Sequence, residues 1–340
     1  MAKLRKTVYC EYEFWKRFTG INTSPSITEQ TISTMQRWIS IYNFLSRSNI
    51  LFDISVQELQ NLIKTDRCLF MLWKKYVGAE CGLNCVKDTF VHLNSIQTKE
   101  MDNYKLNAMY LTCGDTELSD KIASNYGIAI LNVNTLDKSD SFFDEKTIPI
   151  KKTFKKKPDI NWHDLSKTNH KCNALAIIDR YLLKSNNSIK YNLIPILDIY
   201  LPEQISVTFN ISIFTDCLLG DAKTLYDNVH REISKLRPNL KFTFGLFNMN
   251  SKLHDREIIT NYMHITSGSG FDLIDLDKTG EYLRFIHQTS ITACCPFTLP
   301  LSDAVKQIEV YNNLCESLKD IISKCMTNDY YGNKENRILD

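Results

Sequence analysis

The sequence predicts an α/β protein of two domains. The chain has 340 residues, of which 43% are hydrophobic and 24% are charged. This length and composition suit two globular domains, each with a core of its own. In the N-terminal half, short apolar runs of strand-like composition alternate with amphipathic helical segments. That alternation is typical of a parallel sheet with flanking helices.

The N-terminal half is expected to supply four strands, at residues 6–11, 49–53, 106–112 and 128–132. Helices are expected from Ser55 onward and at residues 26–46 and 115–127. Ser55 and Glu58 have the spacing of a capping box, and Gly127 is placed to end the last of these helices. Residues 66–104 are mostly helical or irregular in composition, and no role is predicted for them.

A charged segment separates the two predicted domains. Residues 149–168 contain Pro149 and Pro158 and lack apolar periodicity, which is the signature of a linker. Lysines are concentrated at residues 151–157 of this segment. We therefore predict one domain at residues 1–148, a basic linker at residues 149–168 and a second domain at residues 169–340.

The C-terminal half indicates a second α/β arrangement. Helices are expected at residues 170–184, 221–235 and 300–324. Strands are expected at residues 192–201, 206–214 and 241–247, followed by one or two short strands between Ile258 and Ile265. The polar tail from Thr327 onward is expected to fray.

Carboxylates follow the predicted strands of the N-terminal half. Glu11 and Glu13 follow the first strand, Asp115 and Glu117 follow the third, and Glu58 lies on the helix after the second. In parallel α/β sheets, functional groups gather beyond the carboxyl ends of the strands. Together these acids would hold Mg²⁺ or Mn²⁺, which prefer oxygen ligands and activate water for attack on a phosphodiester. Alternatively, each carboxylate caps a helix N-terminus.

This pattern resembles a PIN-like nuclease domain over residues 5–135. In that family an acidic residue ends the first strand, a glutamate lies early on the helix after the second, and further acids follow a later strand. Glu11, Glu58 and Asp115 match these positions, and residues 126–131 match the strand that follows. Glu11 departs from the aspartate that the family prefers. The resemblance implies metal-dependent nuclease chemistry with Glu11, Glu58 and Asp115 as catalytic residues.

A histidine and an arginine lie two residues apart in the C-terminal half, at His254 and Arg256. In a strand, residues two apart share a face, so the two side chains should project together. The Gly268-Ser269-Gly270 turn follows and brings backbone close to them. A histidine, a guanidinium and a turn of small residues suit a phosphate site.

The spacing of His254, Arg256, Asn261 and Gly268-Ser269 resembles the phospholipase-D-type motif, HxK, x4, D, x6, GS or GG. In that family the histidine attacks phosphorus, the lysine binds phosphoryl oxygens, and two motifs meet at one site. Here Arg256 replaces the lysine and Asn261 replaces the aspartate. The resemblance implies catalysis by His254 and Arg256 without a metal, and phosphate binding by Asn261, Gly268 and Ser269. A homodimer would supply the second motif.

The run from His254 to Ile258 also resembles the start of the phospholipase-D-like C-terminal domain of MIT-domain proteins, in which the fold serves binding. Three roles therefore stay open for His254 and Arg256, namely catalysis, anion binding, and a structural ion pair that holds the hairpin.

The bulk properties limit the compartment and the partners. The net charge of +2 provides no global basic field that would attract nucleic acid. The lysines of residues 151–157 are a local basic segment that could contact a nucleic-acid backbone. Eleven scattered cysteines suit a reducing cytoplasm. No apolar stretch approaches the ~20 residues that span a bilayer, and the start of the chain lacks a secretory signal. We expect a cytoplasmic protein without a membrane span.

Together these observations predict a phosphodiester-cleaving nuclease with RNA favoured over DNA as its substrate. Nucleic acid is the expected partner, within a homodimer or a larger defence complex. The two-module architecture is similar to that of effectors of prokaryotic antiviral defence. The alternative is a non-catalytic interaction module that binds a protein partner, a lipid headgroup or nucleic acid through the phospholipase-D-like domain.

Overall fold

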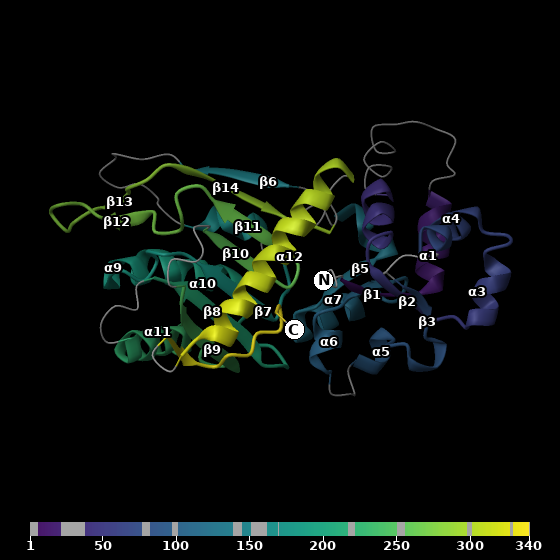
Figure 1. Cartoon of the computed structure of the whole chain (residues 1–340), viewed down its shortest axis with the longest axis horizontal. Coiled ribbons are helices and arrows are strands. Elements are labelled where there is room, and N and C mark those ends of the chain that lie inside the picture. Colours follow the sequence, from purple (N-terminus) through teal and green to yellow (C-terminus); the bar gives the residue numbers. More distant parts are fainter. Residues whose placement is uncertain are drawn as a thin grey trace. The chain divides into compact units, whose positions relative to one another are not determined.

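The computed structural model describes eleven stretches of the chain, at residues 6–21, 38–76, 82–96, 101–138, 145–150, 162–168, 170–216, 222–249, 256–297, 301–326 and 329–339. The chain divides into two compact units (Figure 1). Unit 1 comprises Met1–Asp144 and Pro296–Asn312, and unit 2 comprises Glu145–Cys295 and Asn313–Asp340. Residues 169–340 were predicted to form one domain, whereas residues 296–312 belong to unit 1.

Unit 1 is built on a parallel sheet, as the sequence predicts, but the sheet has five strands where four were expected. Its strands are β1 (Thr7–Cys10), β2 (Asn49–Phe52), β3 (Leu83–Cys85), β4 (Met109–Thr112) and β5 (Ala129–Asn132). Their order is β3-β2-β1-β4-β5, and every neighbouring pair is parallel. Strand β3 lies in the region to which the sequence assigned no role. Because the chain adds strands first on one side of β1 and then on the other, β1 and β4 flank a topological switch point.

Short helices connect these strands, and their ends follow local sequence signals. They are α1 (Tyr12–Ile21), α3 (Val56–Leu62), α4 (Arg67–Tyr76), η1 (Lys87–Thr89), α5 (Leu93–Ile96), α6 (Asn103–Leu106), α7 (Thr116–Tyr126) and η2 (Val133–Lys138). The capping box of Ser55 and Glu58 is confirmed, and Gly127 ends α7 with a φ of 60°. Residues 38–45 of the predicted helix 26–46 are helical, residue 46 lies in a turn, and residues 26–37 lie outside the described residues.

Unit 2 is built on a mixed eight-stranded sheet of order β15-β9-β8-β7-β10-β11-β14-β6. Its strands are β6 (Lys146–Ile150), β7 (Ala174–Ile178), β8 (Phe209–Thr215), β9 (Phe242–Asn248), β10 (Glu257–Thr260), β11 (His264–Ser267), β14 (Thr289–Cys294) and β15 (Tyr330–Gly332). Strands β7, β8 and β9 are parallel, and the other neighbouring pairs are antiparallel. Strand β6 includes the first two residues of the predicted linker, and its other residues lie in the predicted first domain. A separate ribbon, β12 (Ile274–Leu276) with β13 (Leu283–Phe285), forms what we call the β12–β13 arm.

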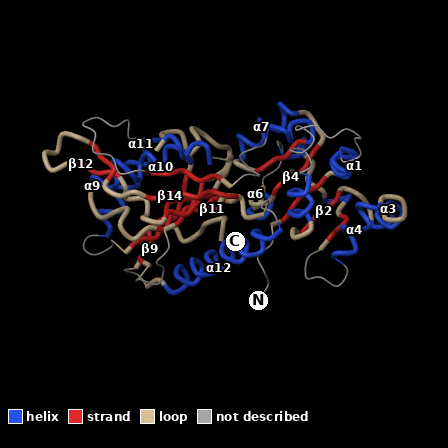
Figure 2. Tube along the Cα trace, turned by 90° about the horizontal axis from the view of Figure 1, so that it is seen from above, coloured by secondary structure: helices blue, strands red, loops and turns tan. Residues whose placement is uncertain are grey.

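The helices of unit 2 lie on both faces of its sheet. They are η3 (His163–Thr168), α9 (Asn186–Ser188), the π-helix η4 (Ile189–Leu193), α10 (Ile194–Tyr200), α11 (Ala222–Leu236) and α12 (Leu301–Lys324), of which residues 313–324 belong to unit 2. Figure 2 shows α10 and α11 over one face and α12 along the other. None of the helices in the described stretches is both long and apolar enough to cross a bilayer.

Two elements of unit 2 differ in type from the prediction. The predicted helix at residues 170–184 contains strand β7, because its apolar run is buried on both faces and such a run suits a strand as well as a helix. The predicted strand at residues 192–201 is helical instead. Its buried side chains, Leu193, Ile196, Leu197 and Tyr200, follow helical spacing.

The C-terminal tail belongs to the core of unit 2 and is not frayed over residues 329–339. Strand β15 pairs with β9, and Arg337 is only 5% exposed. The Arg337 Nη1 donates to the backbone oxygens of Asn173 at 3.2 Å and Thr208 at 3.3 Å. Asn336 Nδ2 donates to the Leu175 backbone oxygen at 3.1 Å. These contacts hold the tail against the start of β7.

Candidate functional site

A pocket of about 340 Å³ lies at the edge of the unit 2 sheet where β7 ends. Strands β7 and β11 run in the same direction with β10 antiparallel between them, so the end of β7, the start of β10 and the turn after β11 meet there. The lining residues are Asp179, Tyr181, Lys184, Arg256, Gly268, Ser269, Asp272 and His287. Three predicted site residues, Arg256, Gly268 and Ser269, are therefore brought together.

Arg256 is held against the turn that follows β11. Its Nη1 donates to the Gly268 backbone oxygen at 3.1 Å. Its Nε is buried and has no hydrogen-bond partner in the described part of the chain. Gly270 has a φ of 86°, and a Cβ added there would lie 2.7 Å from Asp179 Oδ2 and 2.8 Å from Arg256 Cδ. The approach of the turn to Arg256 thus depends on glycine at this position.

Asp179 follows β7 directly and anchors the pocket. Its Oδ1 accepts from the backbone N–H groups of Tyr181 at 2.8 Å and Leu182 at 3.1 Å, and its Oδ2 accepts from Phe271 N–H at 2.7 Å. Burial raises the pKa of Asp179, while these hydrogen bonds and the charge of Arg256 oppose the rise. The carboxylate ties the end of β7 to the segment after β11. Sequence reasoning missed it because residues 170–184 were expected to form a helix.

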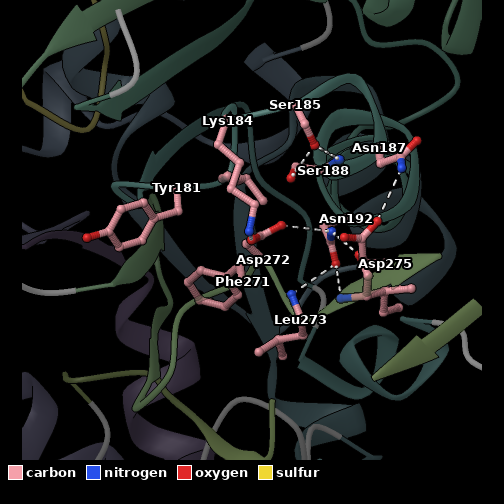
Figure 3. Close-up of polar contacts among 12 residues, drawn as sticks. Tyr181, Lys184, Ser185, Asn187, Ser188, Asn192, Phe271, Asp272, Leu273 and Asp275 are labelled. Atoms are coloured by element: carbon pink, nitrogen blue, oxygen red, sulfur yellow. Dashed lines mark hydrogen bonds and ion pairs between the residues drawn. The ribbon is translucent and has the colours of Figure 1, made fainter. Parts of the chain in front are cut away.

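Lys184 supplies the second cation of the pocket. Its Nζ forms an ion pair with Asp272 Oδ2, and its side chain stays 41% exposed while that of Asp272 is 9% exposed. Asn192 Nδ2 donates to the other carboxylate oxygen of Asp272 at 3.4 Å. Figure 3 shows Lys184, Asp272 and Asn192 in a continuous chain of contacts. The Lys184 ammonium therefore has a set position and still reaches the pocket.

Among the described residues, the remaining motif residue of unit 2, Asn261, does not line this pocket. His254 lies outside the described residues. Asn261 lies at the opposite end of the β10–β11 hairpin and is fully buried. Its Oδ1 accepts from the backbone N–H groups of Asn173 at 3.0 Å and Ala174 at 2.9 Å, and its Nδ2 donates to Asn173 Oδ1 at 3.1 Å. We therefore correct the predicted phosphate-binding role of Asn261 to a structural one, because strands of four residues separate it from Gly268.

The β10–β11 hairpin also contains a buried contact between a histidine and a carboxylate that the sequence did not predict. His264 Nε2 lies 3.0 Å from Glu257 Oε2, and the two residues are 2% and 7% exposed. The pair joins the strands on either side of the turn. A structural ion pair was one of the roles left open for His254 and Arg256, and the contact between Glu257 and His264 holds the same hairpin through different residues.

In unit 1, Glu11 lies at the topological switch point between β1 and β4. Its Oε2 accepts from Thr112 Oγ1 at 2.8 Å and from the Cys113 backbone N–H at 3.0 Å. Asp53, which follows β2 and was not predicted as a site residue, accepts from Tyr12 N–H at 2.7 Å. Burial raises the pKa of Asp53, and the charge of Glu11 adds to the rise. Glu11 therefore lies where the sequence predicts it, with Asp53 as its acidic neighbour.

Two of the other predicted acids cap helices. Glu58 Oε2 accepts from the Ser55 backbone N–H at 2.7 Å, and its Oε1 lies 2.8 Å from Lys87 Nζ. The hydrogen bond from Lys87, supported by those from Ser55, lowers the pKa of Glu58 to about 2. Asp115 is the N-cap of α7 and accepts from Leu118 N–H at 2.8 Å. These contacts satisfy backbone groups that a helix leaves without partners.

Glu13 and Glu117 are exposed. Glu13 pairs with Lys16 at 3.8 Å and Arg17 at 3.1 Å, and Glu117 lies in the first turn of α7. Throughout the described stretches, no group of three or more His, Cys, Asp or Glu residues could hold a metal ion. All five predicted ligands lie in those stretches, so in this arrangement they do not fit a shared Mg²⁺ or Mn²⁺ site. The lysines of residues 151–157 lie outside the described residues.

Comparison with known proteins assigns no family to the chain. No protein-family model matches the sequence, and no curated protein matches it. The resemblances to PIN-like and phospholipase-D-like domains thus stay predictions from short motifs. The candidate site rests on the contacts of unit 2 alone.

Proposed function

We propose that the chain binds a phosphate group of a nucleic acid in the pocket of unit 2. The observation that carries this proposal is that Arg256 and Lys184 line one pocket, with His287 and Ser269 beside them. Arginine offers a planar fork of N–H donors that matches phosphate oxygens, and lysine adds a compact positive charge. The resemblance to the phospholipase-D-type motif supports the same ligand chemistry.

The bonding of the charged groups favours an anion over a cation as the ligand. Asp179 already accepts three backbone N–H groups, and Asp272 already contacts Lys184 and Asn192. By contrast, a guanidinium has five N–H donors, and within the described residues one side-chain hydrogen bond is found for Arg256, to Gly268. The pocket therefore offers donors and positive charge, while its carboxylates are engaged with the protein.

Cleavage of the bound phosphodiester is the enzymatic extension of this proposal. His254 would attack phosphorus and displace one ester oxygen, which the second histidine of a homodimer would protonate, and Arg256 would stabilise the charge that develops on the phosphoryl oxygens. Water, deprotonated by that second histidine, would then break the phosphorus–nitrogen bond of the covalent intermediate and release the phosphate product. RNA is the favoured substrate, and a role in prokaryotic antiviral defence rests on similarity of architecture alone. A two-histidine site would require a homodimer, which a measurement of molecular mass in solution tests.

A second candidate function is metal-dependent cleavage at the switch point of unit 1. The observation that favours it is that Glu11 and Asp53 directly follow the neighbouring strands β1 and β2, in which Cys10 pairs with Phe52. The charge of Glu11 also contributes to the raised pKa of Asp53. Two carboxylates at the carboxyl ends of parallel strands lie where such sheets bind ligands. The absence of a third ligand among the described residues makes this the weaker candidate.

Calorimetric titration with inorganic phosphate and with a short single-stranded RNA tests the binding proposal. We expect Arg256→Gln to weaken both affinities at least tenfold, which corresponds to about 1.4 kcal/mol. The matched control is Arg231→Gln, which removes an exposed arginine of α11. Unchanged affinity in Arg256→Gln, or an equal loss in Arg231→Gln, would overturn the proposal.

A cleavage assay with RNA and DNA in Mg²⁺, Mn²⁺ or EDTA separates the two candidate reactions. Cutting that resists EDTA and is lost in His254→Ala supports chemistry in unit 2. Cutting that requires metal and is lost in Glu11→Gln supports chemistry in unit 1. Binding without cutting under any condition identifies the chain as a non-catalytic interaction module.

A further inference from the structure

The pocket is connected to the β12–β13 arm by one buried side chain. Asn192 is fully buried in the π-helix η4. Its Oδ1 accepts from the backbone N–H groups of Leu273 at 3.1 Å and Ile274 at 2.8 Å, and its Nδ2 donates to the Ile274 backbone oxygen at 2.9 Å. The amide of Asn192 thus pairs with the chain at the start of β12 as another backbone segment would (Figure 3).

The same amide also contacts the charged pair of the pocket. Asn192 Nδ2 donates to Asp272 Oδ1, while Asp272 Oδ2 holds Lys184 Nζ. Asp272 is 7% exposed, so its position is set by these partners and not by solvent. A single side chain of η4 therefore contacts both the carboxylate that holds Lys184 and the first strand of the arm.

The local geometry of η4 makes this double contact possible. A π-helical turn inserts one extra residue relative to an α-helix and re-aims the side chains around it, and such turns are frequent at functional sites. Here the π-helix spans Ile189–Leu193 and lies directly before α10. Four contacts from one buried amide would not be retained if Asn192 were replaced by an apolar residue.

We propose that Asn192 is a positioning residue that couples anion binding in the pocket to the order of the β12–β13 arm. The inference rests on the proposed phosphate-binding function. Lys184 has three N–H donors, and Asp272 holds it in place while its exposed part reaches the ligand. Asn192 holds Asp272, and Asp272 restrains Lys184 before an anion binds. Lys184 therefore loses less side-chain conformational entropy on binding. Linkage is reciprocal, so an anion on Lys184 stabilises the arm in return.

A double-mutant cycle tests this coupling through phosphate affinity measured by calorimetry. We expect Asn192→Ala to weaken phosphate binding about fivefold in the otherwise unchanged protein. In a Lys184→Met background the same substitution should have no effect, because the group that it positions is gone. The matched control is Asn187→Ala, which removes a hydrogen bond of 3.2 Å to Asp275 farther along β12 and should leave phosphate affinity unchanged.

Hydrogen exchange of the unmodified protein provides a second test that needs no variant to fold. The backbone N–H groups of Leu273 and Ile274 donate to Asn192. Added phosphate should slow their hydrogen exchange. Chloride at equal ionic strength should leave their exchange unchanged. An equal loss of affinity from Asn192→Ala with and without Lys184, or unchanged exchange at saturating phosphate, would overturn the coupling. If Lys184→Met and Arg256→Gln both leave phosphate affinity unchanged, the proposed function itself fails.

Discussion

Acidic side chains at the carboxyl edges of both sheets accept hydrogen bonds from the protein, and in unit 2 two cations lie beside them. In unit 1, Glu11 accepts hydrogen bonds from Thr112 and Cys113, and Asp115 caps a helix. In unit 2, Asp179 is engaged with backbone in the same way, but two cations beside it line a pocket. Acids at strand ends therefore do not by themselves make a metal site, because backbone N–H groups compete for the same oxygens.

The comparison also separates the roles of glycine in the two units. Gly127 in unit 1 ends α7, a role that depends only on its left-handed backbone conformation. Gly270 in unit 2 has that conformation as well, but it also lies against Asp179 and Arg256. Only the second position links backbone conformation to the candidate site.

The largest effect is expected from Gly270→Ala. This variant tests whether the pocket of unit 2 depends on the close approach of Gly270 to Asp179 and Arg256. The new Cβ would meet Asp179 Oδ2 at 2.7 Å in a backbone conformation of φ 86°. We expect a loss of about 3 kcal/mol in the free energy of unfolding, from backbone strain and overpacking together. Urea denaturation measures this loss, and phosphate titration should show that binding is lost with it.

The matched control for that variant is Gly280→Ala in the turn of the β12–β13 arm. Gly280 has a φ of 74°, but no heavy atom lies within 4 Å of an added Cβ. Backbone strain alone should cost about 1 kcal/mol there. Equal losses at the two glycines would show that the contact with Asp179 and Arg256 is unimportant.

An intermediate effect is expected from Asp115→Ala, which tests whether the unit 1 acids are caps. Loss of the N-cap of α7 should lower the free energy of unfolding by about 1 kcal/mol, whereas Asp115→Asn should restore most of it because asparagine caps equally well. Hydrogen exchange of the α7 amides measures both changes. Metal-dependent cleavage that disappears in Asp115→Asn would show instead that the carboxylate binds a metal.

The smallest effect is expected from the pH dependence of Glu58. Its pKa falls from 4.5 to about 2 in the folded protein, chiefly through the hydrogen bond from Lys87. The folded state therefore favours the ionised carboxylate, so this stabilisation is complete above pH 4.5 and is lost as the pH falls toward 2. Glu58→Gln should flatten the pH dependence of unfolding in that window, as measured by acid titration of the circular dichroism.

Glu117→Gln is the control for that titration, because it removes an exposed carboxylate of α7 that makes no capping bond. Its unfolding curve should follow that of the unchanged protein. If Glu58→Gln and Glu117→Gln behave alike, the contacts of Glu58 with Ser55 and Lys87 do not influence stability.

Much of unit 1 follows from short-range signals in its sequence. The parallel sheet was predicted from alternating strands and helices, and the capping box of Ser55 and Glu58 from a spacing of three residues. In unit 2, the hairpin of β10 and β11 and the approach of the Gly268 turn to Arg256 were predicted as well. Each of these features depends on residues that are close together along the chain.

The components that sequence reasoning missed depend on distant partners. Asp179 binds Phe271, 92 residues away, and Asn192 binds Leu273, 81 residues away. No periodicity or spacing marks either residue as part of a site. The error at β7 had a related cause, because an apolar run buried on both faces looks the same in a strand and in a helix.

By itself, the sequence determined the α/β class, the capping box of Ser55 and Glu58, the glycine that ends α7, and the pairing of a guanidinium with a turn of small residues. These properties depend on backbone preferences and hydrogen bonds within a few residues. Only the tertiary structure decided which charges remain available to a ligand. It engages Glu11 with the Thr112 hydroxyl and the Cys113 backbone N–H, buries Asn261 far from Gly268, and brings Lys184 beside Arg256. The availability of a charged group depends on all of its neighbours, and folding selects those neighbours from distant parts of the chain.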